Sequence, residues 1–248
     1  MRRELLYVGC SRARTLQDLN IDGVFIPPSA PGPLDSVTQE MARLQATSGP
    51  LSLRFLQDVN SDTWKIVFHN VQRLMPHLLD IFADHSTMTA DVLAFVEPWL
   101  TVGDHPRLEG FVINSRTNSQ TTPNSYGSIL FSRPGTRIED TGFSSTICRQ
   151  GHINATTWTL DRVYFVMIYS HPTVNFRELT HFLTPILHSR SEHPTVVLGD
   201  FNLNLLSDAR LLKFFITFGM KEVTTRIPST DYRTKLDACF SNIQELDA

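Results

Sequence analysis

The sequence has few cysteines. Its 248 residues include only Cys10, Cys148 and Cys239, an odd number with no Cys-x-x-Cys pair. Disulfide scaffolds and zinc ribbons need paired, closely spaced cysteines, so both classes are excluded. We expect three free thiols, which are typical of a reducing compartment, and therefore a nuclear or cytoplasmic location.

Long apolar runs and an excess of one charge are also missing. No stretch approaches the roughly 20 apolar residues that a membrane span requires, and we expect no signal peptide because the first apolar run is broken at Gly9. Lys and Arg number 22 and Asp and Glu 25, a net charge of -3. Proteins that coat nucleic acid carry a strongly basic surface. This composition excludes such a coat but allows an enzyme that contacts nucleic acid briefly.

No glycine-rich loop ending in Gly-Lys-Ser or Gly-Lys-Thr occurs in the sequence. The backbone of such a loop cradles the phosphates of a nucleoside triphosphate. We therefore expect neither ATP binding nor ATPase activity from this chain.

The sequence does contain a short apolar run that ends in polar residues, at Pro194–Asn202. Thr195–Leu198 is rich in strand formers and too short for a helix, so it predicts a buried strand. Gly199 permits a tight turn at the exit, which places Asp200 and Asn202 on the same side. A carboxylate beside an amide suits an oxygen-preferring cation and a phosphate oxygen. A strand end closed by an Asx-turn is the structural alternative.

Two earlier segments repeat this pattern. Trp64–Val71 predicts a buried strand with Asn70 near its end, and Leu74–Ala83 has helical spacing. Ala90–Leu100 predicts a second strand in which Glu97 follows five apolar residues. A carboxylate is costly to bury there without a partner. A glutamate exposed at the strand exit is the alternative.

The rest of the chain predicts an α/β domain. Strands are expected at Glu109–Ser115, Ser128–Ser132, Thr157–Leu160 and Val163–Tyr169, and helices at Phe176–Leu187 and Leu205–Phe218. Strand-rich halves with intervening helices fit a sandwich of two sheets with helices outside.

Five motifs follow one another in a recognisable order. They are Phe-His-Asn-Val-Gln-Arg-Leu around Asn70, Phe-Val-Glu-Pro-Trp-Leu around Glu97, Val-Met-Ile-Tyr-Ser-His-Pro around Tyr169, Gly199–Asn202, and Leu236-Asp237. Together they resemble the endonuclease/exonuclease/phosphatase superfamily, and in particular the apurinic-type endonuclease domain of LINE retrotransposons. The resemblance implies a four-layer α/β/β/α sandwich, two packed mixed sheets flanked by helices, over residues 63–248.

The resemblance also implies a Mg²⁺-dependent phosphodiester hydrolase that acts on DNA, with Mn²⁺ as an alternative ion and no small-molecule cofactor. By this resemblance, Glu97 holds the metal with help from Asn70, and Asp200 orients or deprotonates the attacking water. Asn202 binds the scissile phosphate, and Tyr169 stabilises the developing charge or the leaving group.

The C-terminal part departs from the family pattern. Asp237 should orient a catalytic histidine in a Ser-Asp-His segment, but the sequence contains no histidine after His193. We therefore expect a C-terminally truncated domain without its last strand, impaired or inactive as a nuclease. His171 is a candidate substitute, although a loop histidine before a proline is more often structural or solvated. His69 is expected on the opposite face from Asn70.

Thr224 is a further candidate, as a supporting hydroxyl in the same family pattern. Thr225 follows it directly, and spacing does not distinguish the two.

The N-terminal part carries a different resemblance. Leu-Tyr-Val-Gly-Cys-Ser-Arg-Ala-Arg-Thr-Leu, at residues 6–16, is similar to the last ATPase motif of superfamily-one DNA helicases of the Pif family and of Helitron transposons. It implies that Arg12 contacts a γ-phosphate, whereas charge alone favours a solvated turn. We predict a helicase remnant at residues 1–33, ending in the proline-rich Pro27–Pro33, and a linker with one helix at residues 34–62.

Two other functions remain open. One is a catalytically inactive DNA- or partner-binding remnant of a mobile-element protein. The other is a phosphatase or lipid phosphodiesterase of the same superfamily, because its active-site residues overlap with those above.

Overall fold

The computed structural model describes residues 63–118, 126–149, 151–190, 192–224 and 233–243. These residues belong to one compact unit, Val59–Ala248. The predicted helicase remnant with Arg12, the linker helix and Thr225 lie outside the described residues.

The first sheet has four strands in the order β1-β2-β4-β3. They are β1 (Ile66–Asn70), β2 (Val92–Val96), β3 (Val112–Arg116) and β4 (Ser128–Ser132). β1 and β2 run parallel, whereas β4 is antiparallel to both of its neighbours. Parallel neighbours need a crossover connection, and helices α4 (Leu74–Ala83) and α5 (His85–Met88) lie within it. The carboxyl ends of β1 and β2 consequently lie side by side.

The second sheet has six strands in the order β5-β6-β7-β8-β10-β9. They are β5 (Glu139–Ile147), β6 (His152–Leu160), β7 (Val163–Ser170), β8 (Thr195–Asp200), β9 (Lys221–Glu222) and β10 (Asp237–Ser241). β7 and β8 are parallel and joined through helix α6 (Phe176–His188), and α7 (Arg210–Ile216) lies between β8 and β9 in the chain. The carboxyl ends of β7 and β8 are therefore neighbours as well.

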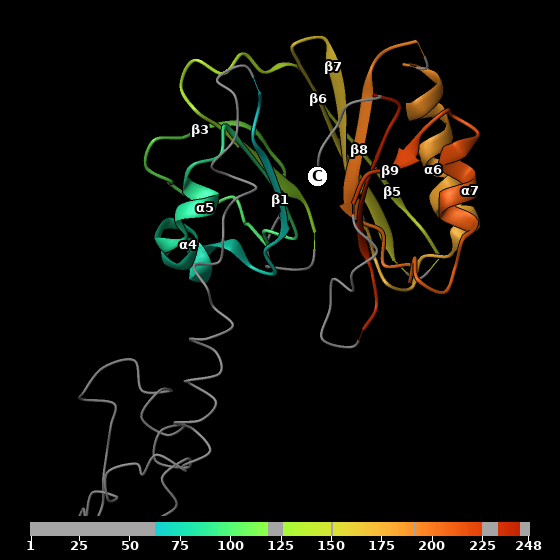
Figure 1. Cartoon of the computed structure of the whole chain (residues 1–248). Helices are drawn as coiled ribbons and strands as arrows, with labels where there is room; N and C mark the ends of the chain where they lie inside the picture. The colour runs from blue at the N-terminus through green and yellow to red at the C-terminus, as the bar shows by residue number, and fades with distance from the viewer. Residues whose placement is uncertain (1–62, 119–125, 150, 191, 225–232, 244–248) are drawn as a thin grey trace, which may run out of the picture. The chain divides into compact units, whose positions relative to one another are not determined.

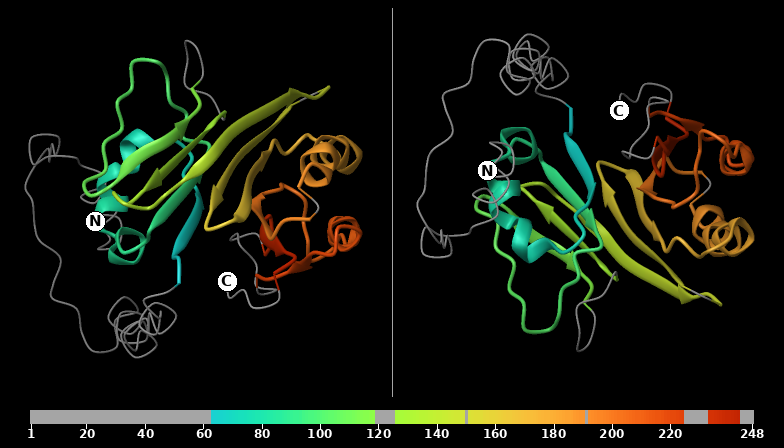
Figure 2. Two further views of the ribbon diagram at one scale, coloured as in Figure 1. Left: turned by 90° about the horizontal axis from the view of Figure 1, so that it is seen from above. Right: turned by 90° about the horizontal axis from the view of Figure 1, so that it is seen from below.

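Three separate apolar clusters show that the unit is a four-layer sandwich. The cluster between the sheets includes Val92 and Ala94 of β2 and Trp158 and Met167 of the second sheet. The alternate residues Leu93 and Phe95 face the other way and pack with Leu74 and Ile81 of α4. Figure 1 shows the resulting order, with α4 and α5 outside the first sheet and α6 and α7 outside the second. Figure 2 shows the same layers from above and below. The predicted α/β/β/α architecture is confirmed.

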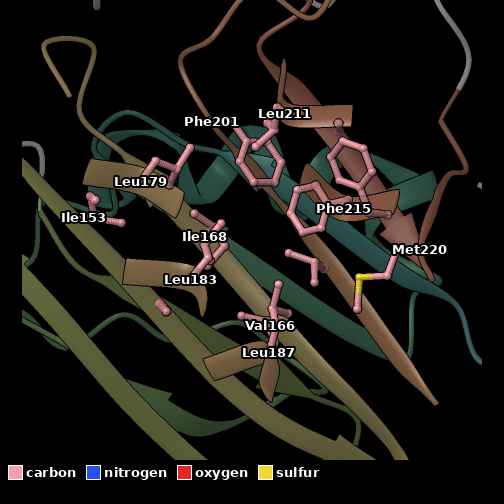
Figure 3. Close-up of a cluster of buried hydrophobic side chains, with 14 of the residues drawn as sticks. Ile153, Val166, Ile168, Leu179, Leu183, Leu187, Phe201, Leu211, Phe215 and Met220 are labelled. Atoms are coloured by element: carbon pink, nitrogen blue, oxygen red, sulfur yellow. The ribbon is translucent and has the colours of Figure 1, made fainter. Parts of the chain in front are cut away.

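The largest cluster covers the outer face of the second sheet. Leu179, Leu183 and Leu187 recur along α6 at helical spacing and pack against Val166 and Ile168 of β7. Figure 3 shows these side chains together with Phe201, Phe215 and Met220. The cluster fixes β7 and β8 against their helices, and so it fixes the strand ends that carry polar residues.

Several element boundaries differ from the sequence predictions. The predicted helix over Leu205–Phe218 is shorter, since α7 begins only at Arg210 after a series of turns. The predicted strand Thr157–Leu160 begins earlier, at His152. β5 was not predicted, because this edge strand is largely exposed and lacks regular apolar alternation. Among the described residues, no helix combines the length and apolarity that would let it cross a membrane.

Candidate active site

The first sheet presents Asn70 and Glu97 at one edge. Asn70 is the last residue of β1 and pairs in register with Val96, so Glu97 follows one position beyond the neighbouring strand. Backbone bonds continue past the strands, with the Arg73 N–H donating to the Glu97 carbonyl (2.9 Å) and the Leu74 N–H to the Pro98 carbonyl (2.9 Å). Glu97 has a φ of 51°, a left-handed conformation that non-glycine residues rarely adopt. Such local strain is typical of functional sites.

The second sheet presents a row of four polar side chains. Asp200 pairs with Asp237 of β10 on one side and with Tyr169 of β7 on the other, and Tyr169 pairs with Asn154 of β6. Residues paired across strands point to the same face. Tyr169 belongs to the cluster between the sheets, so the row faces the first sheet. The pairing thus brings Asp200, Tyr169 and Asp237 together, as the sequence motifs implied.

The amide of Asn70 joins the two sheets. Its Nδ2 donates to Oδ2 of Asp200 (2.8 Å) and to Oε1 of Glu97 (3.2 Å). One nitrogen therefore contacts two carboxylates from residues 103 positions apart in the sequence, 200 against 97. Both carboxylates are buried, with 7% of Glu97 and 6% of Asp200 exposed. Glu97 is not the exposed strand-exit residue of the alternative interpretation.

A tryptophan that the sequence did not identify as a site residue holds the other side of Glu97. Nε1 of Trp99 donates to Oε2 of Glu97 at 3.0 Å. Each oxygen of the Glu97 carboxylate therefore accepts one hydrogen bond from the protein, and each keeps lone-pair capacity for another contact. Trp99 lies two residues from Glu97, beyond the end of β2, and the sequence analysis gave it no role.

The end of β8 differs in one respect from its prediction. Gly199 is not a turn residue but lies inside the strand, which extends to Asp200. A Cβ on Gly199 would lie 2.4 Å from the backbone oxygen of Ile168 on β7, so glycine is needed for close approach of the two strands. The turn comes one residue later, where Asn202 has a φ of 50°.

The strand end is closed as the structural alternative predicted. The Asn202 N–H donates to Oδ1 of Asp200 (3.0 Å), which closes an Asx-turn. Nδ2 of Asn202 donates to the carbonyl of Ser170 at the end of β7 (2.8 Å). The turn therefore fixes Asp200 against Asn70 and Asn202 against the end of β7, and it leaves a functional role open to both.

The surroundings of Asp200 raise its pKa to about 7. Burial is the main cause, because it disfavours the ionised form, and the nearby Asp237 and Glu97 carboxylates add repulsion. The hydrogen bonds from Asn70 and from the Asn202 N–H act in the opposite direction but do not compensate. Asp200 thus changes its protonation state near neutral pH.

Aromatic and imidazole rings extend the site beyond Tyr169, of which only 2% is exposed. The ring of His152 lies 5.4 Å from that of Tyr169 and 5.6 Å from that of His171. Nδ1 of His171 accepts from the Thr173 N–H (3.3 Å), which leaves the ring proton of a neutral imidazole on Nε2. The predicted candidate His171 therefore lies close to the site, and His152 is a neighbour that the sequence analysis missed.

The other candidates lie farther from the carboxylates. Oγ1 of Thr224 accepts from the Cys239 N–H of β10 at 3.4 Å, so Thr224 supports the strand that carries Asp237. His69 is exposed, as expected for the face opposite Asn70. Asn154, the cross-strand partner of Tyr169, was missed because its strand was predicted to begin only at Thr157.

The donor set favours a hard cation. Two carboxylates and one amide converge here, and Mg²⁺ and Ca²⁺ prefer such oxygen ligands. Burial, and then the neighbouring carboxylates, raise the pKa of Asp200, and a divalent cation would favour its ionised form. Within the described parts of the chain, no group of three or more His, Cys, Asp or Glu residues has the arrangement of a metal centre. A cation here would thus need Asn70 or water to complete its ligands.

Two mixed sheets packed face to face, with helices outside, form the α/β sandwich typical of the endonuclease/exonuclease/phosphatase fold. A sequence model of the endonuclease/exonuclease/phosphatase family matches residues 60–235, and the chain belongs to this family. A search of curated proteins finds no match.

Solved structures show the same fold at low sequence identity. An AP endonuclease from Archaeoglobus fulgidus is 14% identical with a TM-score of 0.55, covering 73% of this chain and 87% of that one. An endonuclease/exonuclease/phosphatase family protein from Leptotrichia buccalis is 15% identical with a TM-score of 0.53, covering 75% and 89%. The 3′ phosphatase NExo from Neisseria, bound to a product DNA hairpin, is 17% identical with a TM-score of 0.52, covering 72% and 86%.

Proposed function

We propose that this protein is a Mg²⁺-dependent phosphodiester hydrolase that cleaves DNA. One observation carries the proposal: the Asn70 amide contacts both Glu97 and Asp200, which follow or end strands of different sheets. Phosphodiester hydrolysis requires a site that holds a divalent cation, activates a water and neutralises charge that develops on the phosphate. The residues around Asn70 can meet these requirements.

Glu97 and Asn70 would hold the cation. Glu97 is fixed by two hydrogen bonds and is buried, so its carboxylate offers a charge whose position is set in advance. Asn70 now turns Nδ2 toward the carboxylates while its Oδ1 accepts from the Gln72 N–H (3.2 Å), and it would present Oδ1 to a cation. When bound, Mg²⁺ supplies Lewis-acid stabilisation of the phosphate oxygens.

Asp200 would orient and deprotonate the attacking water. General bases work best when their pKa lies near the operating pH, and the pKa of Asp200 is raised to about 7. The Asx-turn holds Oδ1 toward the Asn202 N–H, and Asn70 bonds Oδ2, so the carboxylate cannot rotate freely. Its position next to Glu97 brings the base beside the residue that would hold the cation.

Asn202 and Tyr169 would contact the phosphate. Nδ2 of Asn202 already donates to the Ser170 carbonyl, which fixes the amide at the end of β7. Tyr169 pairs in register with Asp200, so its side chain belongs to the same row as the base. Neutral donors that are fixed in advance stabilise developing negative charge without reorganisation.

The family pattern places a histidine imidazole beside Asp237, and residues 194–248 do not contain one. The sequence has no histidine after His193, and the pairing of β10 with β8 places Asp237 beside Asp200. Loss of a positioned acid–base group typically costs about 10²- to 10⁴-fold in rate. A protein that lacks this group should therefore cleave DNA slowly.

Two findings support DNA as the substrate. NExo, which has a similar fold, is bound to a product DNA hairpin in its structure, and the A. fulgidus protein is an AP endonuclease. The helicase-like motif around Arg12 points the same way, to a helicase-endonuclease protein of a mobile element acting in the nucleus or cytoplasm. The net charge of -3 fits brief contact with DNA and not a permanent complex.

Nicking of supercoiled plasmid tests the proposal. The chain should convert plasmid to the open circle slowly with Mg²⁺ or Mn²⁺ and not at all with EDTA, and Asp200→Ala should abolish the reaction. A version extended by a Ser-Asp-His segment should be at least tenfold faster. An extended protein that is as inert as Asp200→Ala would reject DNA hydrolysis.

The similarity to the 3′ phosphatase NExo favours one second function, phosphate removal from a DNA 3′ end. The same donors would then act on a terminal phosphate monoester. A labelled oligonucleotide with a 3′ phosphate, compared with a phosphodiester phospholipid and with intact plasmid, separates this activity from lipid phosphodiesterase activity and from nicking. A protein that binds DNA without converting any of these substrates would be the inactive DNA-binding remnant.

A further inference from the structure

Trp99 contacts the candidate metal site in an unusual way. Its Nε1 donates to Oε2 of Glu97 at 3.0 Å, opposite the Asn70 amide on Oε1. Trp99 itself has a φ of 50°, a left-handed conformation with a large side chain. Such a conformation is unfavourable for a residue other than glycine and persists only where the surrounding structure enforces it.

The backbone around Trp99 shows what enforces this conformation. The Leu74 N–H bonds the carbonyl of Pro98, and Leu74 is fully buried at the start of α4. Leu100, on the other side of Trp99, is also fully buried. Leu74 and Leu100 both belong to the apolar cluster under α4, so the chain is anchored on both sides of Trp99. The left-handed turn then places the half-buried indole within hydrogen-bond distance of Glu97.

We propose that Trp99 is a positioning residue for the cation that Glu97 would hold. This inference rests on the proposed metal-dependent function, and it assigns a role to a residue of the Glu97 motif to which the family resemblance gave none. Two donors, one on each oxygen, limit rotation of the carboxylate and leave each oxygen with lone-pair capacity for a cation. Hydrogen-bond partners of metal ligands typically contribute about 10- to 100-fold to metal affinity.

The chain contains a matched control for this contact. Nε1 of Trp64 donates to Oδ2 of Asp161, so Trp64 is also an indole bonded to a carboxylate. Trp64 precedes β1, whereas Asn70 ends it, so this second pair lies at the other end of the strand. Trp64→Phe and Trp99→Phe therefore delete the same chemical group, and only the second deletes it at the candidate site.

Calorimetric titration with Mn²⁺ compares the full-length wild-type protein with both variants. Trp99→Phe should weaken Mn²⁺ binding by about 10-fold or more, and Trp64→Phe should bind as the wild type does. Equal Mn²⁺ affinity for Trp99→Phe and Trp64→Phe would overturn the positioning role. Wild-type protein that binds no Mn²⁺ would instead overturn the proposed metal-dependent function, and this inference with it.

A second measurement avoids the substitution at residue 99. Wild-type protein labelled with 5-fluorotryptophan has three ¹⁹F signals, because the sequence has three tryptophans. Trp64→Phe identifies one signal, and Trp158 is recognised by its full burial and its stacking on Phe165. Substoichiometric Mn²⁺ should broaden the Trp99 signal first, and broadening of Trp64 first, or of all three equally, would contradict the proposal even if Trp99→Phe fails to fold.

Discussion

At the scale of single residues, the site depends on a few side chains that the fold keeps under strain. Asp200 is buried beside other carboxylates, and Glu97, Trp99 and Asn202 all have left-handed backbone conformations. Each arrangement is unfavourable for stability when considered alone. Residues that lower stability in this way are candidates for function. We therefore expect a substitution that removes the strain or the buried charge to abolish function and to stabilise the fold.

Asp200→Asn tests this relation through pH. The folded state keeps the Asp200 proton up to about pH 7, whereas an unfolded aspartate, with a pKa near 3.8, releases it earlier. The folded protein therefore binds more protons between these values, and its stability falls as the pH rises from about 4 to 7. Asn lacks this titration, so Asp200→Asn should be more stable than the wild type at pH 8 by up to ~4 kcal/mol.

Urea unfolding at pH 4.5 and at pH 8, in EDTA, measures this difference. The gain in stability should shrink at pH 4.5, because the folded wild type keeps the Asp200 proton there and the pH lies less than one unit above the pKa of the unfolded aspartate, so little of the pH-dependent loss has accumulated. Asp208→Asn is the control, because this exposed carboxylate bonds Arg210 and lies outside the site. A difference between Asp200→Asn and the wild type that does not change with pH would contradict the raised pKa.

At the scale of elements, the site is fixed by the close approach of β7 and β8. Gly199 leaves no room for a side chain against Ile168, and the register of these two strands sets Asp200 beside Tyr169. The three leucines of α6 press β7 from the outer face. Small changes in the spacing of the strands would therefore move the base relative to Tyr169.

Gly199→Ala should separate these strands. Its Cβ would lie 2.4 Å from the Ile168 backbone oxygen, and neither strand can move without disturbing the packed outer cluster. Overpacking of this kind costs about 1–3 kcal/mol, so urea unfolding should show a loss in that range together with loss of nicking.

Gly103→Ala is the matched control for this substitution. Nothing lies within 4 Å of the Cβ that it would introduce, and its stability should stay close to that of the wild type. Equal stability of Gly199→Ala and Gly103→Ala would show that the approach of β7 and β8 is not tight.

At the scale of the whole described unit, the site joins two sheets that also pack through the apolar cluster between them. Glu97 and Asn70 belong to the first sheet and Asp200 and Asp237 to the second. A cation held by Glu97 and Asn70 would lie beside Asp200 where the two sheets meet, and its charge would lower the pKa of Asp200.

Mg²⁺ should therefore stabilise the protein and release protons as it binds. At a free concentration about 100 times the dissociation constant, the gain should be about 2.7 kcal/mol, measured as a rise in melting temperature that EDTA reverses. Calorimetry at pH 6.5 in buffers of different ionisation enthalpy should detect the proton that Asp200 loses.

Asp200→Asn should show neither the proton release nor the full stabilisation, whereas Asp208→Asn should show both. Stabilisation of Asp200→Asn equal to that of the wild type would place the ion elsewhere.

Much of the fold could be predicted because apolar periodicity is local. Helix α4 occupies the predicted Leu74–Ala83, and the strand Ser128–Ser132 is as expected. β5 escaped prediction because its residues face solvent, and the early part of β6 because Asn154 and Thr156 are polar yet buried. These two residues are buried because the first sheet covers them, and the periodicity of a single strand gives no information on such packing.

The sequence by itself determined the order of polar residues at strand ends, because each follows a local apolar run: Asn70, Glu97, Tyr169 and Asp200. Only the tertiary structure decided that these ends meet, that one Asn70 amide contacts two carboxylates, and that Trp99 and His152 lie among them. The physical reason is that strand pairing and sheet packing, which depend on residues far apart in the chain, set these distances. The raised pKa of Asp200 follows from the same cause, since burial and neighbouring charge exist only in the folded state.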